Sequence, residues 1–168
     1  ILSESIQNEG GNVIWCGRRS LKEIPDGVEY YICDTANREQ VIQMEQELKQ
    51  KGRMLKGIFV CTGNINDSLL KNKDMHDMTS VLNGKIQSVR NLDEAFAKYP
   101  LDFFLMYSSI TAHIPSMGQS DYAFANAFLD SYATYRARKR KKGIRSGRTL
   151  SIAWPFFQNG GMQIDSAS

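Results

Sequence analysis

The chain has 168 residues, of which 42% are hydrophobic and 23% are charged. These values are ordinary for a water-soluble globular protein, and the length allows a sizeable core, so we expect residues 1–168 to form one domain. No apolar run approaches the roughly 20 residues that a membrane-spanning helix needs, and the opening ILSESIQNEGG lacks the features of a signal peptide, which favours a cytoplasmic protein.

The three cysteines, Cys16, Cys33 and Cys61, are odd in number and far apart in the sequence. Each lies in or at the end of an apolar run, so we expect buried, reduced thiols and neither a disulfide framework nor a zinc site. The chain has only two histidines. We therefore predict no bound metal.

The net charge of +3 is concentrated in the segment Arg136–Arg148, which holds eight of the 21 basic residues and no acidic residue. A nucleic-acid surface is disfavoured, because no aromatic residues interleave with the charges to stack on bases. Positive charge at the end of a helix complements the helix dipole, and Gly143 is placed to end such a helix. A third interpretation is a docking surface for an acidic protein.

Short apolar runs alternate along the chain with longer stretches that have helical periodicity. This alternation is typical of βαβ units and predicts a Rossmann-like α/β fold, a doubly wound and mostly parallel sheet with helices on both faces. The strands are expected at residues 12–16, 28–33, 55–61, 103–107 and 149–154. The helices are expected at residues 1–8, 38–51 and 74–99, where a break near residue 83 is allowed, and in the stretch that carries Tyr122.

Right-handed crossovers place the carboxyl ends of all parallel strands along one edge of the sheet. The residues that follow the strands should converge there, and an arginine, an acid and a glycine among them suit a nucleotide-binding crevice. These residues are Arg18, Asp34, Thr62–Gly63, Ser108–Ser109 and Trp154–Pro155.

The stretch from Leu101 to Asp130 combines an apolar strand that ends at two serines with a helix that carries Tyr122 and Asn126. Residues four apart share one helical face, and hydroxyls at the carboxyl end of a strand lie where open α/β sheets bind ligands. Taken alone, these two facts favour a strand and a helix that simply pack together. The rest of the chain favours a chemical role.

Motifs along nearly the whole chain resemble the ketoreductase domain of modular polyketide synthases, a branch of the short-chain dehydrogenases/reductases. The spacing is demanding, with 24 residues from Lys85 to Ser109, 13 from Ser109 to Tyr122 and four from Tyr122 to Asn126. In most short-chain reductases a lysine stands four residues after the tyrosine, whereas the synthase branch exchanges the lysine and the asparagine, as this chain does. The matching motifs are GRRS, the Cys33–Asp34 pair, VLNGKIQSVRNL, MYSSI, GQSDYAFANAFLD, SIAW and NGGM.

The resemblance implies reduction of a β-keto group by NADPH, with four catalytic residues. Tyr122 would donate the proton, since a tyrosine pKa near about 10 keeps the phenol protonated at neutral pH. Lys85 would favour the resulting phenolate, by roughly 1–3 pKa units, and bind the nicotinamide ribose. Ser109 would donate a hydrogen bond to the carbonyl oxygen, and Asn126 would hold a water molecule or the lysine.

The resemblance also implies a set of cofactor-binding residues. Arg18 and Arg19 follow the strand that meets the adenosine ribose, and an arginine there accommodates a 2′-phosphate, which favours NADPH over NADH. A solvated turn arginine is the alternative for Arg18. Asp34 would contact the adenine, and Thr62–Gly63 would pass under the cofactor. The remaining members of the predicted set are Lys85, Tyr122, Trp154 and Pro155.

The configuration of the product is predicted from the residues near the substrate. Ketoreductases that form D-configured hydroxyls carry a Leu-Asp-Asp motif, and this chain has Ile-Asn-Asp there, which keeps the last acid as Asp67. The opposite class carries a tryptophan eight residues before the tyrosine, where this chain has Ile114. The balance favours the D-configured hydroxyl, with Asp67, Ile114 and Gln119 as the predicted stereocontrol residues.

One departure from the family concerns its first strand and glycine-rich loop, which bind the cofactor pyrophosphate and which the sequence does not contain. In the strand order 3-2-1-4-5-6 this strand is central, so we expect no hydrogen-bonded link between the strands at 12–16 and 55–61. We therefore expect an incomplete sheet and a domain truncated at both ends, inactive by itself. The missing part would be supplied upstream or by another chain, or be absent from this sequence.

The implied partners are an acyl carrier protein bearing a phosphopantetheine-linked β-ketoacyl group and the neighbouring domains of a polyketide synthase, with no nucleic acid and no membrane. Because carrier proteins are usually acidic, Arg136–Arg148 is a candidate docking segment. Two alternatives stay open. One is a non-catalytic, reductase-like segment of a synthase, and the other is a stand-alone short-chain reductase of small carbonyl compounds.

Overall fold

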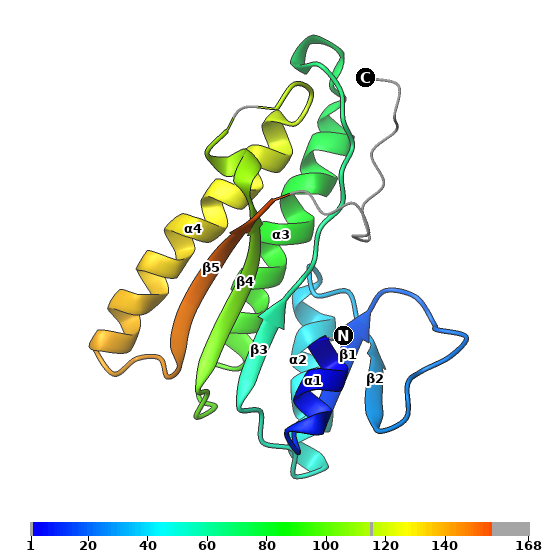
Figure 1. Ribbon diagram of the computed structural model, residues 1–168, viewed down its shortest axis with the longest axis vertical. Coiled ribbons are helices and arrows are strands. Elements are labelled where there is room, and N and C mark those ends of the chain that lie inside the picture. Colours follow the sequence, from blue (N-terminus) through cyan, green and yellow to red (C-terminus); the bar gives the residue numbers. More distant parts are fainter. Residues whose placement is uncertain (1, 115, 156–168) are drawn as a thin grey trace.

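The computed structural model describes residues 2–114 and 116–155 (Figure 1). Strands and helices alternate as the sequence predicts, with boundaries that differ by a few residues, and the NGGM motif lies outside the described residues. The elements are α1 (Leu2–Asn8), β1 (Val13–Gly17), β2 (Val28–Ile32), α2 (Arg38–Gln50), β3 (Gly57–Val60), the short 3₁₀ helix η1 (Leu70–Asn72), α3 (Met75–Ala95), β4 (Phe103–Ser109), the 3₁₀ helix η2 (Ile110–Ala112), α4 (Ser120–Lys141) and β5 (Arg148–Trp154).

All strand pairs are parallel, and they form two separate sheets. β1 pairs with β2, with Val13 opposite Val28. β4 lies between β3 and β5, with Phe103 opposite both Gly57 and Arg148. Within the described residues no backbone pairing joins the two sheets, which confirms the expected gap between β1 and β3.

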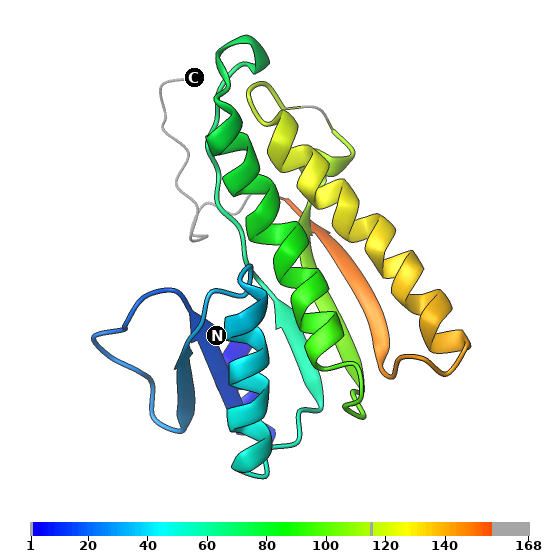
Figure 2. The same ribbon diagram turned by 180° about the vertical axis from the view of Figure 1, so that it is seen from behind.

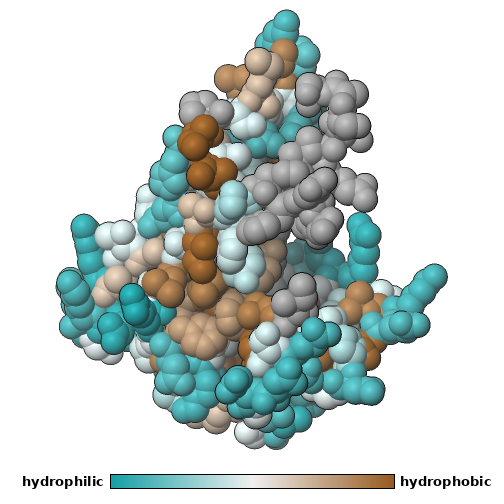
Figure 3. Space-filling view, in the orientation of Figure 1, coloured by the Kyte–Doolittle hydropathy of each residue, from teal (hydrophilic) through white to brown (hydrophobic). Residues whose placement is uncertain are grey.

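Helices α2, α3 and α4 lie side by side over one face of the strands (Figure 2). Alternate residues of β4 point into this layer, and Phe104 and Met106 are completely buried there against Val89 of α3 and Leu129 of α4. The opposite face carries α1 beside β1, and the intervening residues of β4 are only half-buried on that side. Apolar side chains accordingly form a brown band across this face (Figure 3).

α3 runs without interruption through Asn83 and Gly84, so the allowed break near residue 83 is absent. Val81 and Val89 are buried on either side of this point. Burial of a helical face outweighs the roughly 1 kcal/mol by which a single glycine disfavours a helix.

The two sheets are connected through α3, which binds the segment that follows β2. Asn91 Nδ2 donates hydrogen bonds of 3.0 Å to the carbonyl oxygens of both Thr35 and Ala36. The hydroxyls of Thr35 and Ser88 are 2.7 Å apart. These buried contacts hold the loop after β2 against a helix that also packs on β4.

The basic segment Arg136–Arg148 is divided between the interior and the surface. Arg136 is 1% exposed, and its Nε donates to Asp93 of α3 at 2.7 Å, while Arg145 Nε donates to the same carboxylate at 3.0 Å. Gly143 has a φ of 71°, a left-handed conformation that ends α4 as predicted. The accessible positive charge therefore lies mainly in the last turn of α4, Arg138–Lys141, and its cap Lys142, with one further exposed arginine, Arg148, at the start of β5.

The expectation of three buried thiols is correct only for Cys33. Cys61 is exposed because it follows the buried Val60, so strand alternation directs it to the less covered face of the sheet. Cys16 is exposed at the carboxyl end of β1, beside the strand edge that lacks a partner among the described residues.

Candidate active site

Three elements bring the four predicted catalytic residues to the carboxyl end of β4. Ser109 ends β4, Lys85 lies in the middle of α3, and Tyr122 and Asn126 lie in the first two turns of α4. All four side chains belong to residues that are at most 9% exposed. The cluster is thus built into the interface between the larger sheet and the two helices that cover it.

The ammonium group of Lys85 is held over this cluster. Its Nζ donates a hydrogen bond of 2.7 Å to the carbonyl oxygen of Tyr107 and lies 5.6 Å from the centre of the Tyr122 ring. Gly63 lies against the same side chain, because a Cβ at that position would come within 3.0 Å of Lys85 Cε. The structure therefore brings Lys85, Tyr122 and the predicted cofactor-binding Gly63 together.

Burial lowers the pKa of Lys85 to about 8, and the negative potentials of Cys61 and Asp130 oppose that shift only partly. Asp130 is itself engaged, since Ser151 Oγ donates to its carboxylate at 2.6 Å and His113 Nε2 lies 3.1 Å from it. Among the described residues, no carboxylate forms an ion pair with Lys85. A buried lysine without a paired acid is costly, and such groups cluster at functional sites.

The two serines at the end of β4 have different surroundings. Ser108 Oγ donates to the backbone oxygen of Asn126 at 3.2 Å, so this hydroxyl fastens the strand to α4. Ser109 Oγ accepts a hydrogen bond of 3.3 Å from the Thr111 amide at the start of η2, which leaves its own proton available to a ligand. Of the two hydroxyls, that of Ser109 is therefore the one able to donate to a ligand, as its predicted role requires.

Asn126 links the two turns of α4 that carry the site. Its Nδ2 donates to the Tyr122 carbonyl at 2.8 Å, whereas its Oδ1 is buried and accepts no hydrogen bond from the described residues. A buried acceptor is normally satisfied by a protein group or an ordered water molecule. An Oδ1 in this position suits the predicted role of holding a water molecule or the lysine.

The predicted stereocontrol residues Asp67 and Gln119 lie in contact, with Gln119 Nε2 donating to Asp67 Oδ2 at 2.8 Å. Ile114 is 59% exposed. Close to Gln119 is an ion pair that was missed from the sequence, in which Lys73 Nζ lies 2.5 Å from Asp121 Oδ1. These two residues are 48 positions apart, and neither belongs to a motif that indicates the partner.

The residues predicted to bind the adenosine half of the cofactor lie after the strands of the smaller sheet. Arg18 and Arg19 are exposed in the loop after β1. Asp34, directly after Cys33, accepts a hydrogen bond of 3.0 Å from the Ala36 amide through Oδ1. At the end of β5 in the larger sheet, the ring centres of Trp154 and Tyr107 are 5.5 Å apart, and Pro155 is exposed.

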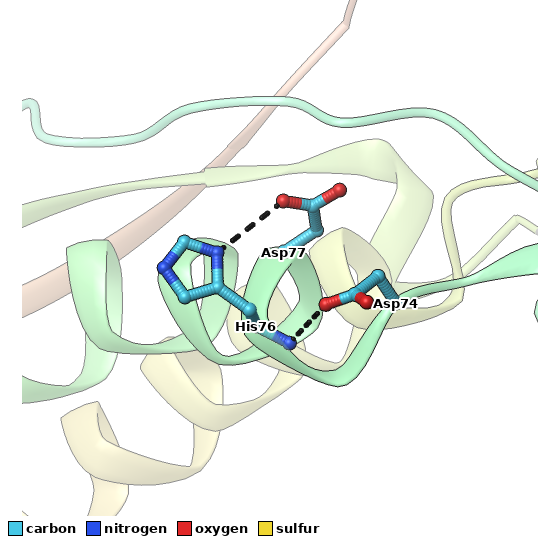
Figure 4. Close-up of side chains that lie close together, drawn as sticks. All are labelled: Asp74, His76 and Asp77. Atoms are coloured by element: carbon cyan, nitrogen blue, oxygen red, sulfur yellow. Dashed lines mark hydrogen bonds and ion pairs between the residues drawn. The ribbon is translucent and has the colours of Figure 1, made fainter.

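Asp74, His76 and Asp77 bring three potential metal ligands together at the start of α3 (Figure 4). Asp74 Oδ1 accepts a hydrogen bond of 2.6 Å from the His76 amide and caps the helix. His76 Nδ1 lies 3.6 Å from Asp77 Oδ1, and the imidazole is 91% exposed. Helix capping accounts for this arrangement, and we assign no ion to it.

None of the helices in the described residues is long and apolar enough to cross a membrane.

Comparison with known proteins gives a consistent set of matches. The family model of the KR domain matches residues 17–159. Polyketide synthase PksN of Bacillus subtilis (strain 168) is 39% identical over 170 residues, which cover 95% of this chain and 3% of that protein. Polyketide synthase PksL of the same organism is 35% identical over 148 residues, covering 88% of this chain and 3% of that protein. This chain thus spans a small fraction of both relatives.

Among solved structures, the crystal structure of a ketoreductase domain from the bacillaene assembly line superimposes with a TM-score of 0.91 and 30% sequence identity. The match covers 99% of this chain and 43% of that one.

Proposed function

Because this chain belongs to the KR domain family, the ketoreductases of polyketide synthases, we propose that residues 1–168 form the catalytic part of an NADPH-dependent β-ketoacyl reductase. The substrate would be a β-ketoacyl group attached to an acyl carrier protein, and the product a β-hydroxyl of D configuration. The observation that carries this proposal is the buried ammonium of Lys85, 5.6 Å from the Tyr122 ring.

Each catalytic residue has a task that its surroundings suit. Tyr122 would donate its phenolic proton to the carbonyl oxygen, and the nearby ammonium of Lys85 would stabilise the phenolate that remains. Ser109 would donate a hydrogen bond to the same oxygen as negative charge develops on it. Asn126 Oδ1 would hold the water molecule from which Tyr122 regains a proton. Bound NADPH would supply the hydride.

The residues around the cofactor position fit a nicotinamide nucleotide. Gly63 offers a close approach beside Lys85, where a side chain would collide with Lys85 Cε. Arg18 and Arg19 are exposed and able to pair with a 2′-phosphate, and Asp34 would contact the adenine. Trp154 and Pro155 would border the nicotinamide end, after β5.

We propose that the basic segment stabilises the end of α4 more than it serves docking. Arg136 and Arg145 are bound to Asp93, and most of the exposed positive charges lie at the end of α4 opposite Tyr122. A rise of 1.5 Å per residue puts Arg138 about 24 Å along the helix from Tyr122. An acidic carrier protein remains the proposed partner. A carrier protein bound at the last turn of α4 would be poorly placed to deliver its acyl group to Tyr122. We therefore propose that the positive charges of this turn complement the helix dipole.

The test is NADPH oxidation with a carrier-bound β-ketoacyl thioester. Because β1 and β3 are not paired, we use this chain joined at its N-terminus to the first strand and glycine-rich loop of the bacillaene ketoreductase, and we call it the extended chain. Tyr122→Phe should lower kcat by at least about a thousandfold, because it removes the proton donor. Phe124→Leu is the control, because Phe124 is exposed and lies two residues, about 200° around α4, from both Tyr122 and Asn126.

Two results would overturn this proposal. Full activity of the Tyr122→Phe variant would exclude Tyr122 as the acid, and an inactive wild-type extended chain that binds NADPH would favour the non-catalytic alternative. Equal rates with free and carrier-bound small ketones would instead favour a stand-alone carbonyl reductase.

A further inference from the structure

The loop after β3 is fastened to the start of α4 at three points. We define this loop as residues 64–73, which carry Asp67 and end before α3. Ser68 donates its amide proton to the Gly118 carbonyl at 3.1 Å, and Gln119 donates to Asp67 at 2.8 Å. The third point is the ion pair of Lys73 and Asp121. The partners of the loop in these contacts, Gly118, Gln119 and Asp121, all lie within four positions of Tyr122 in the sequence.

The third contact differs from the others in its burial and charge. The side chains of Lys73 and Asp121 are 2% and 1% exposed, whereas Lys71, two residues earlier, is exposed. Lys73 Nζ also donates to the Asn66 carbonyl at 3.0 Å, so it closes the loop upon itself. Asp121 Oδ2 is buried and accepts no hydrogen bond from the described residues, so the charge of Asp121 is balanced mainly by Lys73. Removing one partner of such a pair is strongly destabilising, because the other charge is left buried without compensation.

Asp121 connects this pair directly to the catalytic residue. The oxygen that binds Lys73, Asp121 Oδ1, also accepts the Tyr122 amide proton at 2.9 Å. One carboxylate oxygen therefore holds both the end of the loop and the backbone of Tyr122. A negative charge in the first turn of α4 is further favoured by the helix dipole.

We propose that Lys73 and Asp121 are positioning residues, whose buried ion pair fixes the loop of Asp67 relative to Tyr122 and so determines which face of the ketone receives the hydride. This inference rests on the proposed function. Selection between two faces needs only a small difference in barrier, since about 1.4 kcal/mol changes a product ratio tenfold. If the loop moved relative to Tyr122, the difference in barrier between the two faces would disappear, whereas the rate of reduction would fall less.

The first experiment measures loop anchoring without substrate. Amide hydrogen exchange of the extended chain is compared with that of Lys73→Met, which keeps the apolar stem of the side chain but removes its charge. In Lys73→Met, peptides that cover residues 64–73, which include the hydrogen-bonded amide of Ser68, should exchange at least about tenfold faster than in the wild type. Peptides from the second half of α3, which packs against α2, should be unchanged. Lys71→Met is the matched control and should alter neither region.

The second experiment measures the ratio of D- to L-configured product. Lys73→Met and Asp121→Asn should each lower this ratio at least about tenfold, with a smaller fall in kcat, and the effect should persist in high salt because buried pairs are weakly screened. In the double variant neither charge is left unpaired, so thermal stability should recover while the product ratio should not.

Three outcomes would overturn the proposal. They are an unchanged product ratio in both single variants, a ratio that recovers together with stability in the double variant, and equal acceleration of exchange in the loop and in α3. An extended chain that reduces no substrate would refute the proposed function instead, and the exchange experiment would then still decide whether the ion pair anchors the loop.

Discussion

Replacing Lys85 by methionine should make the protein more stable and abolish its activity. Burial lowers the pKa of Lys85 from 10.5 to about 8. A difference of this size corresponds to about 3 kcal/mol by which the charged lysine disfavours folding below pH 8. Methionine fills the same space without a charge, but it loses the hydrogen bond to the Tyr107 carbonyl, which is worth about 1 kcal/mol. The expected net gain in the free energy of unfolding at pH 7 is about 2 kcal/mol.

The gain should depend on pH in a defined direction. Between pH 8 and 10.5 the unfolded chain keeps the Lys85 proton while the folded protein loses it. The unfolded state then binds more protons, so the stability of the wild type rises with pH in this interval, and the advantage of Lys85→Met shrinks and disappears above it. Over the same range kcat of the wild type should fall as pH rises through about 8, because Lys85 loses the charge that stabilises the phenolate.

Urea unfolding of the extended chain at pH 7, 8.5 and 10, together with the pH dependence of kcat, measures both effects. Lys49→Met is the matched control, since Lys49 is exposed on α2 and should change stability by less than about 0.5 kcal/mol at every pH. The reasoning would be refuted if Lys85→Met were less stable than the wild type at pH 7, or if its advantage were the same at all three pH values.

Two further substitutions test the packing around the site. Asp93→Asn should lower the free energy of unfolding by about 3–5 kcal/mol, because Arg136 would keep a buried charge without its partner; Glu94→Gln, at an exposed neighbour, should cost under about 0.5 kcal/mol. Gly63→Ala should lower kcat about tenfold by displacing Lys85, with little change in melting temperature. Gly84→Ala, whose methyl would meet Asn64 instead, is its control, and equal losses in both variants would contradict this account.

Local patterns in the sequence predict most of the fold. The apolar runs around Phe104 and Ile58 and the helical spacing of Val41, Met44 and Leu48 correspond to buried positions, because periodicity reflects which face an element turns to the core. The unpaired edge of β1 was also predictable, from a strand that the sequence does not contain. The continuity of α3 through Gly84 was not, since it depends on what packs against the helix.

The candidate site shows the same division. The spacing of Lys85, Ser109, Tyr122 and Asn126 was visible in the sequence, but the pairs of Lys73 with Asp121 and Asp93 with Arg136 were not. Each pair joins residues more than 40 positions apart. A charged residue in an amphipathic stretch is predicted to be exposed, because its ion-pair partner is known only once the fold is known. For the same reason Arg136 was grouped with exposed lysines although it is completely buried.

The contacts of α3 with the loop after β2 fix the distance and the angle between that loop and the carboxyl end of β4. Lys85 and Asn91 lie on one rigid helix, six residues and about 9 Å apart. Asn91 holds the loop that follows Asp34, and Lys85 lies at the proposed catalytic end. If the proposed cofactor binds there, the helix would act as a fixed spacer between its adenine and nicotinamide ends. One residue inserted between them would rotate one end by about 100° relative to the other, so the length of this part of α3 should tolerate no change, whatever its surface residues are.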